Sequence, residues 1–332
     1  MKENDAGGAR GGTGTLSRPE PPHPLPTGPG GRKARRGRRS AEDNRAAYAF
    51  LTPWLIGMAV FTIGPMLFSL YLAFTRYDLS SAPEWIGFEN FDRMFTTDPR
   101  FWTSVDVTLT YVLWSVPLLL VVSLLLAMVL NRGLRFLSGY RALFYMPSLI
   151  GGSVAVAALW RQIFGEEGIV NKALAAIGID HGSWVGDPES ALYTIVVLQV
   201  WTFGSAMVIF LAGLRQIPQE LYDAAAVDGA SPMRRFRSVT LPMLSPLVFF
   251  NLLLSVVNAF QAFTGAYVVS NGTGGPADST LFYTLYLYEQ GFAQLNMGYA
   301  AAMAWVLVLG LAVFTGLLFL SSRYWVHYGD ER

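Results

Sequence analysis

Six apolar blocks, each long enough to cross a membrane as a helix, dominate this sequence of 332 residues. A spanning helix needs about 20 mostly apolar residues, because each residue adds about 1.5 Å to its length. The blocks cover residues 48–74, 107–130, 142–164, 191–214, 243–270 and 299–321. They predict an all-α membrane protein with about six transmembrane helices, since a helix satisfies its own backbone polar groups in lipid.

The composition favours the same class. Hydrophobic residues make up 52% of the chain and charged residues only 14%, whereas soluble domains average about 25% charged residues. The chain has no cysteine, so neither a disulfide framework nor a thiolate metal site is expected. Its histidines, His23, His181 and His327, are far apart in sequence and predict no metal site.

Charged residues are absent from long stretches of four blocks. No Asp, Glu, Lys or Arg occurs between residues 107 and 131, 142 and 160, 191 and 214, or 243 and 277. Ionisable groups inside a membrane are costly, and where they occur they mark proton or ion pathways. Their absence disfavours a proton-coupled carrier and favours a transporter with an external energy source.

The first 46 residues differ from the rest, because they are rich in Gly, Pro and Arg and poor in aliphatic side chains. Such a segment is expected to be disordered. Its basic run, 32–39, allows nucleic-acid binding, a targeting signal, or a cytoplasmic tail that contacts anionic lipid. We favour the lipid-contacting tail and expect no nucleic-acid partner, since basic residues before a spanning block follow the positive-inside rule.

The distribution of basic residues predicts the orientation. With a cytoplasmic N-terminus, nine basic residues beyond the tail fall on the inside and five on the outside. The inner ones are Arg132, Arg135, Arg141, Arg215, Arg234, Arg235, Arg237, Arg323 and Arg332, and the outer ones are Arg76, Arg93, Arg100, Arg161 and Lys172. Both termini are therefore predicted to be cytoplasmic.

The segment between the fourth and fifth blocks, 215–242, has the pattern of a short helix followed by a turn. Pro218 fits a first helical turn, and Glu220 and Asp223 are favoured near the positive end of the helix dipole. Three alanines follow, and Gly229 is a suitable helix stop. The sequence therefore predicts a short helix that ends in a sharp turn at Gly229.

A second helix is predicted after this turn. Ser231 and Pro232 fit an N-cap and a first turn, and Leu241–Pro242 is expected to end this piece where the next spanning block begins. The segment lies on the predicted cytoplasmic face. Its composition fits either a surface on which another protein docks or an amphipathic helix that lies on lipid.

The same segment carries a recognisable signature. Asp223-Ala224-Ala225, Gly229 and the run 239–242 resemble the Glu-Ala-Ala (EAA) motif of binding-protein-dependent ABC import permeases. Other stretches resemble the carbohydrate branch of that family, in the same order along the chain: 85–91, 144–147, 168–171, 274–276, 279–280 and 297–302. The chain looks most like the maltose- and glycerol-phosphate-type first permease subunit.

The resemblance implies the type I ABC importer permease architecture in a prokaryotic cell membrane. Residues 47–332 would form the permease domain, with 215–242 as a coupling loop that docks into an ATPase subunit. The residues implied in this coupling are Glu220, Asp223, Ala224, Ala225, Asp228, Gly229, Leu241 and Pro242. At Asp223 the family usually has Glu, so an ion pair made here would be longer, water-bridged or rearranged.

The resemblance also implies partners. They are a homologous second permease, an ATPase dimer that binds ATP and Mg, and an extracytoplasmic binding protein that delivers a sugar. The chain itself lacks a phosphate-binding loop, because none of Lys2, Lys33 and Lys172 follows a glycine and precedes Ser or Thr. We therefore expect a pore subunit with no cofactor and no enzymatic activity of its own.

A sugar path needs neutral hydrogen-bonding groups and aromatic faces. The candidates within the fourth and fifth blocks are Gln199, Trp201, Asn258, Phe260 and Gln261. The alternative role for the amides is hydrogen bonding between helices. Two other classes of function stay open from the residues: a carrier or channel that works without ATP, and a membrane-anchored interaction protein.

Overall fold

The computed structural model describes residues 48, 50–133, 136–179 and 182–327. The chain divides into two compact units, Met1–Ile63 and Gly64–Arg332, and each is described by itself. The predicted N-terminal tail, 1–46, and two residues of the predicted cytoplasmic side, Arg135 and Arg332, lie outside the described residues. In the first unit, residues 50–63 are helical, with a π-helical turn at Ala59–Ile63, and its described side chains are largely exposed.

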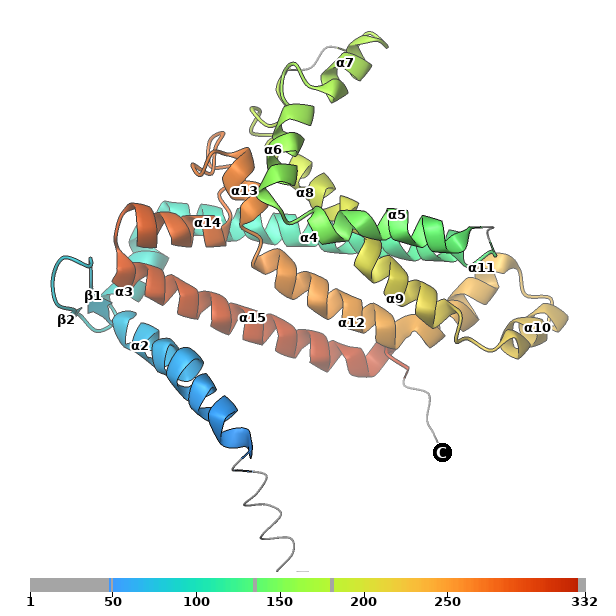
Figure 1. The fold of residues 1–332 in the computed structure, drawn as a ribbon, viewed down its shortest axis with the longest axis horizontal. Coiled ribbons are helices and arrows are strands. Elements are labelled where there is room, and N and C mark those ends of the chain that lie inside the picture. The colour runs from blue at the N-terminus through green and yellow to red at the C-terminus, as the bar shows by residue number, and fades with distance from the viewer. Residues whose placement is uncertain (1–47, 49, 134–135, 180–181, 328–332) are drawn as a thin grey trace, which may run out of the picture. The chain divides into compact units, whose positions relative to one another are not determined.

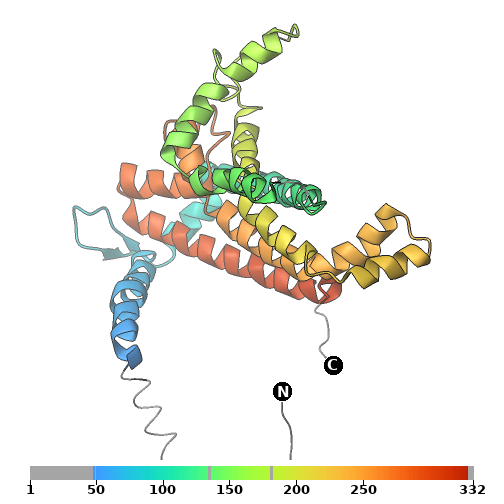
Figure 2. The ribbon, with the colours of Figure 1, turned by 45° about the vertical axis from the view of Figure 1, so that its right-hand side comes forward.

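The second unit is almost entirely helical (Figures 1 and 2). Its sheet is one antiparallel pair, β1 (Thr75–Arg76) and β2 (Glu84–Trp85), in which Thr75 lies opposite Trp85. The helices are α2 (Gly64–Leu72), α3 (Glu89–Asp92), α4 (Pro99–Leu130), α5 (Leu137–Ile150), α6 (Val154–Ile163), α7 (Ile169–Ala175), α8 (Ala191–Trp201), α9 (Gly204–Leu214), α10 (Gln219–Val227), α11 (Pro232–Arg235), α12 (Leu241–Phe260), α13 (Thr264–Val269), α14 (Tyr283–Tyr288) and α15 (Met297–Trp325). π-helical turns occupy Arg93–Thr97, Phe236–Thr240 and Glu289–Ala293.

Four described helical runs are long and apolar enough to cross a membrane: Phe50–Leu72, Pro99–Leu130, Pro232–Phe260 and Met297–Trp325. Two bent pairs, α5 with α6 and α8 with α9, raise the number to six if each pair is one span. Each of these six runs overlaps one of the six apolar blocks of the sequence. The all-helical membrane fold predicted from block length is confirmed.

The third and fourth blocks are not the single helices that the sequence predicted. The axes of α5 and α6 differ by 99°, and those of α8 and α9 by 43°. The first break falls at Gly151 and Gly152, after which the hydroxyl of Ser153 caps α6 by accepting from the Val156 amide. Hydropathy depends on composition and not on backbone conformation, so the apolar pattern could not predict where these helices break.

The fifth block also differs from its predicted bounds. The helix begins at Pro232 and ends at Phe260, and residues 264–269 form the separate helix α13. Leu241–Pro242 does not end a helical piece, because the chain stays helical from α11 through the π-helical turn into α12. A proline in a first turn lacks only an amide that has no partner there, and here the π-helical turn before α12 accommodates it.

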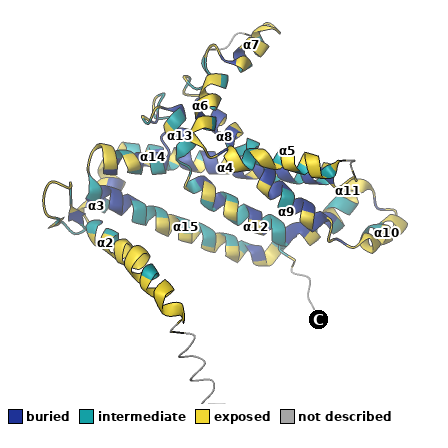
Figure 3. Ribbon diagram, viewed as in Figure 1, coloured by how far each residue is buried: buried dark blue, intermediate teal, exposed yellow. Residues whose placement is uncertain are grey.

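Helix α4 is the centre of the packing. It contacts α8, α9 and α12, and buried residues recur along its length, including Phe101, Tyr111, Leu119 and Leu130. Figure 3 shows this buried face as a dark band along α4, while α2 is mostly exposed. Buried hydroxyls do not disturb the packing, since Ser123, for example, donates to the Leu119 carbonyl at 2.6 Å.

An ionic network ties the first turn of α4 to distant segments. The Arg100 guanidinium donates to both oxygens of Asp278 at 2.9 Å and to Glu289 at 2.7 Å. Asp98 accepts from the hydroxyls of Tyr286 and Tyr299, each at 2.6 Å. The network lies at the α14 end of the second unit, and α10 and α11 lie at the other end (Figure 1).

Candidate functional site

The coupling loop, 215–242, is a compact helical bracket that projects beyond the end of α9. Its first helix, α10, begins at Gln219, and Pro218 is its N-cap with φ −59° and ψ 133°, one position before the predicted first turn. Glu220 lies in the first turn, as predicted. Asp223 accepts a hydrogen bond from the Gln219 side chain at 3.2 Å.

Gly229 ends α10 in the way its residue type predicts. Its φ is +71°, in the left-handed region that side chains other than hydrogen disfavour. The Ala230 amide donates to the Ala225 carbonyl at 2.9 Å, and the Gly229 amide donates to Ala226 at 3.0 Å. This pair of bonds is a Schellman motif, so the predicted helix stop is confirmed.

The second helix begins as predicted, and residues of this second half of the loop form hydrogen bonds to the first half. Ser231 caps α11 by accepting from the Arg234 amide at 3.4 Å, and Arg235 donates to the Ala230 carbonyl at 2.9 Å. The hydroxyls of Tyr222 and Thr240 share a hydrogen bond of 3.0 Å across the bracket. The sequence pattern did not indicate this Tyr222–Thr240 contact, since it joins residues 18 apart on two helices.

One side of the bracket packs against the rest of the second unit, and the other side is exposed. Ile217 and Ala230 are buried, and Tyr222 and Val239 pack against the cluster formed at the ends of α4, α9 and α12. Of the predicted coupling residues, six are exposed and two, Ala225 and Pro242, are half-buried. None of the acids Glu220, Asp223 and Asp228 has an ion-pair partner among the described residues. Helix α10 therefore exposes acids without ion-pair partners beside small alanine side chains.

The second candidate site is a cavity of about 450 Å³ at the level of the helix breaks. Three breaks converge there: Gly151–Gly152 after α5, Thr202 after α8, and residues 261–263 between α12 and α13. All its lining residues are uncharged. In transporters, broken helices at membrane depth are tolerated where the freed backbone lines a cavity.

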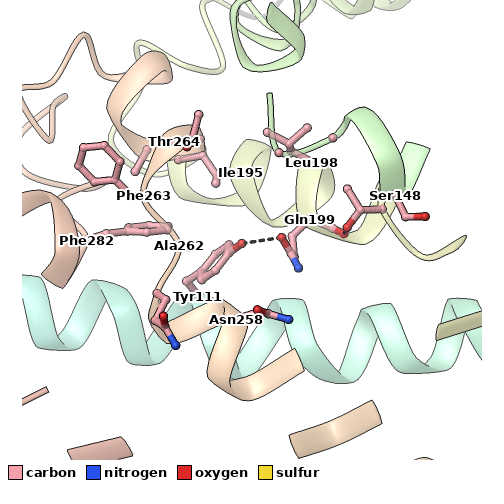
Figure 4. A pocket seen from close by; sticks show the side chains of 16 residues that line it. Tyr111, Ser148, Ile195, Leu198, Gln199, Asn258, Ala262, Phe263, Thr264 and Phe282 are labelled. Atoms are coloured by element: carbon pink, nitrogen blue, oxygen red, sulfur yellow. Dashed lines mark hydrogen bonds between the residues drawn. The ribbon is translucent and has the colours of Figure 1, made fainter. Parts of the chain in front are cut away.

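The cavity contains two side-chain amides with no hydrogen-bond partner. Asn258 and Gln261 both line it, both are exposed to it, and neither side chain bonds to another described residue. Gln199 also lines the cavity, but its oxygen accepts from the Tyr111 hydroxyl at 3.3 Å (Figure 4). The Tyr111 ring in turn packs on Phe282, with ring centroids 4.7 Å apart.

The structure separates the five predicted path residues into two groups. Gln199, Asn258 and Gln261 come together in the cavity. Trp201 instead packs on Trp160 at 5.7 Å between ring centroids, and Phe260 packs on Phe314 at 5.5 Å. Neither aromatic side chain lines the cavity.

Several lining residues were missed by sequence reasoning, among them Tyr111, Ser148, Thr264 and Phe282. Tyr111 carried a usable signal, because it is the one tyrosine in the block 107–130. Ser148 and Thr264 had none, since their place depends on breaks that hydropathy does not report. Within the described part of the chain, no group of three or more His, Asp or Glu side chains could hold a metal ion.

Comparisons with known proteins agree with this architecture. Residues 99–326 match the family described as "Binding-protein-dependent transport system inner membrane component". The chain is 50% identical over 306 residues to "Probable ABC transporter permease protein YesP" of Bacillus subtilis, covering 92% of this chain and 99% of that protein. It is 33% identical over 282 residues to "Lactose transport system permease protein LacF" of Rhizobium radiobacter, covering 83% and 93%.

A solved structure shows the same fold. A chain of the bacterial alginate ABC transporter in complex with an alginate pentasaccharide-bound periplasmic protein superposes with a TM-score of 0.72 and 21% identity, covering 86% of this chain and 96% of that one. With the family match over two thirds of the sequence, this protein belongs to the binding-protein-dependent inner membrane components, and it is a multi-pass permease subunit of an ATP-driven ABC importer rather than an enzyme.

Proposed function

We propose that this permease imports a saccharide through the cavity at the helix breaks. The observation that carries the proposal is the pair of unpaired amides, Asn258 and Gln261, in a cavity with no charge in its lining. A sugar offers hydroxyls that need both donors and acceptors, and an amide supplies both. Relatives named for lactose, arabinooligosaccharides and trehalose/maltose support the same class of solute.

The coupling loop is the proposed docking site for an ATPase dimer that binds ATP and Mg. Asp223 and Glu220 are free to pair with basic residues of that partner, and Ala224 and Ala225 allow close approach. The Schellman turn at Gly229 and the Tyr222–Thr240 bond support this role, because a rigid bracket transmits a push better than a mobile loop.

The proposed assembly has the loop and both termini in the cytoplasm. The nine-to-five excess of basic residues supports that orientation. A homologous second permease would close the open side of the cavity, and an extracytoplasmic binding protein would deliver the solute from outside. Anionic lipid is the proposed partner of the N-terminal basic run.

A transport assay tests the proposal. Vesicles that carry the assembled importer are supplied with labelled lactose, maltose, trehalose, arabinotriose and trigalacturonate, with and without ATP. Replacing Asn258 and Gln261 with alanine should raise the KM for the transported saccharide about fivefold to thirtyfold, at about 1 kcal/mol for each lost hydrogen bond. Uptake of no saccharide in the panel, or uptake that needs no ATP, would contradict the proposed function.

A matched control lies in the same helix. Asn251 is also an asparagine of α12, but it is buried, outside the cavity, and donates to the Leu247 carbonyl at 2.8 Å. Asn251→Ala should lower stability and leave the KM unchanged. If it raised the KM as much as the double replacement, the effect would be structural and the cavity would lose its assignment.

A further inference from the structure

A second hollow, a groove of about 540 Å³, runs between α5 and α9. On α5 its wall includes Arg141 and Tyr145, which lie one turn apart on the same face. On α9 it includes Ser205, Ile209 and Ala212, which follow the spacing of one helical face. Apart from the Arg141 guanidinium, the walls carry only hydroxyls and apolar side chains.

The groove continues the cavity toward the coupling loop. On α5, the cavity residue Ser148 is three residues beyond the groove residue Tyr145. Across from it, the cavity residue Thr202 is three residues before the groove residue Ser205. Three residues of helix correspond to about 4.5 Å on α5, and Thr202 lies in the turn that leads into α9, so the two hollows follow one another along α5 and α9.

Arg141 is unlike the other arginines near this end. Its Nε is shielded from solvent without a hydrogen-bond partner, and its guanidinium forms no salt bridge with a described residue. Arg132 and Arg215, by contrast, are exposed. A shielded donor without an acceptor is costly, and the cost is larger for a charged group. The groove therefore presents a cation that lacks its anion.

We propose that this groove is the stretch of the solute path between the cavity and the coupling loop, and that Arg141 binds a carboxylate of the solute in it. The inference rests on the proposed function and narrows it to acidic saccharides such as uronate oligomers. A guanidinium binds a carboxylate with two parallel hydrogen bonds, which makes it selective as well as attractive.

An anionic phospholipid headgroup offers the same chemistry and is the main competing occupant. It accounts for a cation beside apolar walls, but not for a groove that leads into an uncharged polar cavity. Thiol chemistry can distinguish a saccharide path from a lipid site. Because the chain has no cysteine, a single introduced cysteine is the only thiol in this subunit.

The first experiment measures whether the groove is aqueous and positive. Ala212→Cys, in the assembled importer, is treated with an anionic thiol reagent (sulfonatoethyl methanethiosulfonate) and a cationic one (trimethylammonioethyl methanethiosulfonate). We expect both to react, and we expect Arg141→Gln to lower the ratio of anionic to cationic rates about fivefold to tenfold. Arg141→Lys should restore most of the ratio. No reaction at this position, or an unchanged ratio in Arg141→Gln, would overturn the inference.

Two control variants make the result specific. Arg132→Gln removes an exposed charge from the same end of the bundle and should leave the ratio unchanged. Leu211→Cys is next to Ala212 on α9, but Leu211 is fully buried, so this cysteine should not react. Equal effects of Arg132→Gln and Arg141→Gln would show a diffuse surface potential and overturn the assignment to Arg141.

The second experiment identifies the anion. Trigalacturonate and its fully methylated ester are compared as protectants of Ala212→Cys against the neutral reagent methyl methanethiosulfonate. The acid should protect at about fivefold lower concentration than the ester, and Arg141→Gln should abolish that difference. Equal protection by both, or by neither, overturns the acidic saccharide, and loss of bound phosphatidylglycerol from Arg141→Gln in native mass spectrometry would then assign the site to lipid. If the same vesicles still take up a saccharide in an ATP-dependent way, the proposed function stands and only the acidic-saccharide inference is wrong.

Discussion

The coupling loop and the cavity differ in how far apart in sequence their contacting residues lie. The loop is local: every contact that shapes it joins residues within the 28 positions from 215 to 242, apart from the packing of its base. The cavity is assembled from α4, the break after α5, α8 and the end of α12, which are far apart in sequence. The loop's shape therefore depends on neighbouring residues, whereas the cavity's shape depends on how several distant helices pack.

The difference predicts different responses to mutation. A substitution in the loop should disconnect the energy source and leave solute binding intact. A substitution in the cavity should weaken solute binding and leave the connection to the ATPase intact.

Gly229→Val should have the largest effect. A side chain at φ +71° costs about 1–2 kcal/mol, and a β-branched one costs more, so the turn is expected to rearrange and misdirect α10. We expect ATP-dependent uptake to fall to background while membrane insertion, followed by immunoblot, stays normal. Gly316→Val is the control, because a side chain there would meet open space. Equal losses in the two variants would contradict the role of the turn.

Asp223→Arg should lower uptake about tenfold or more. A hydrogen bond to a charged group contributes about 1.5–3 kcal/mol, and reversing the charge adds repulsion from a basic partner. Asp92→Arg, an exposed acid in α3, serves as the matched control. Recovery of uptake by an acidic replacement in the ATPase would establish the pair, and normal uptake in Asp223→Arg would exclude it.

Tyr222→Phe should have an intermediate effect on coupling. It removes the hydrogen bond to Thr240, which we expect to contribute about 1 kcal/mol to holding α10 against the second helix. The number of ATP molecules hydrolysed per solute transported should rise about threefold to fivefold. Tyr140→Phe, for which the structure shows no hydrogen bond from the hydroxyl to a described residue, should change nothing. A raised KM with unchanged stoichiometry would place Tyr222 in solute binding and break the division.

Tyr111→Phe should have the smallest effect. It should change solute binding in the cavity and not coupling to the ATPase. The hydrogen bond to Gln199 is long, at 3.3 Å, and such bonds between membrane helices average about 0.6 kcal/mol. The KM should therefore change by no more than about threefold, while the ATP stoichiometry stays constant. A change in stoichiometry without a change in KM would link the cavity to the energy source.

The same division explains what could be predicted from the sequence. Gly229 and Ser231 act through their own residue type, so the turn and the second helix start were predictable from the pattern. Block length alone predicted an all-helical membrane fold. The breaks after Ile150 and Trp201 were not predictable from apolar composition, because they depend on close contact between the two broken segments: a side chain at Gly204 would collide with the Phe144 carbonyl.

The cavity was predicted in part, for a geometric reason. Polar residues in apolar blocks pointed to Gln199, Asn258 and Gln261, which do meet. The neighbouring aromatics did not follow them, because successive helical residues turn by about 100°. Phe260, between Asn258 and Gln261, therefore faces Phe314 on α15 instead of the cavity.

Cross-linking can show whether an ATPase docks on the coupling loop. Val227, on α10, is 89% exposed, and Ile177, just after α7, is 71% exposed. With Val227→Cys in this cysteine-free chain and a cysteine-scanned ATPase, we predict a cross-linked product whose yield changes when ATP is added, and no product with Ile177→Cys. Absence of an ATPase product from Val227→Cys, or an equal yield from Ile177→Cys, would show that the coupling loop is not the ATPase docking site.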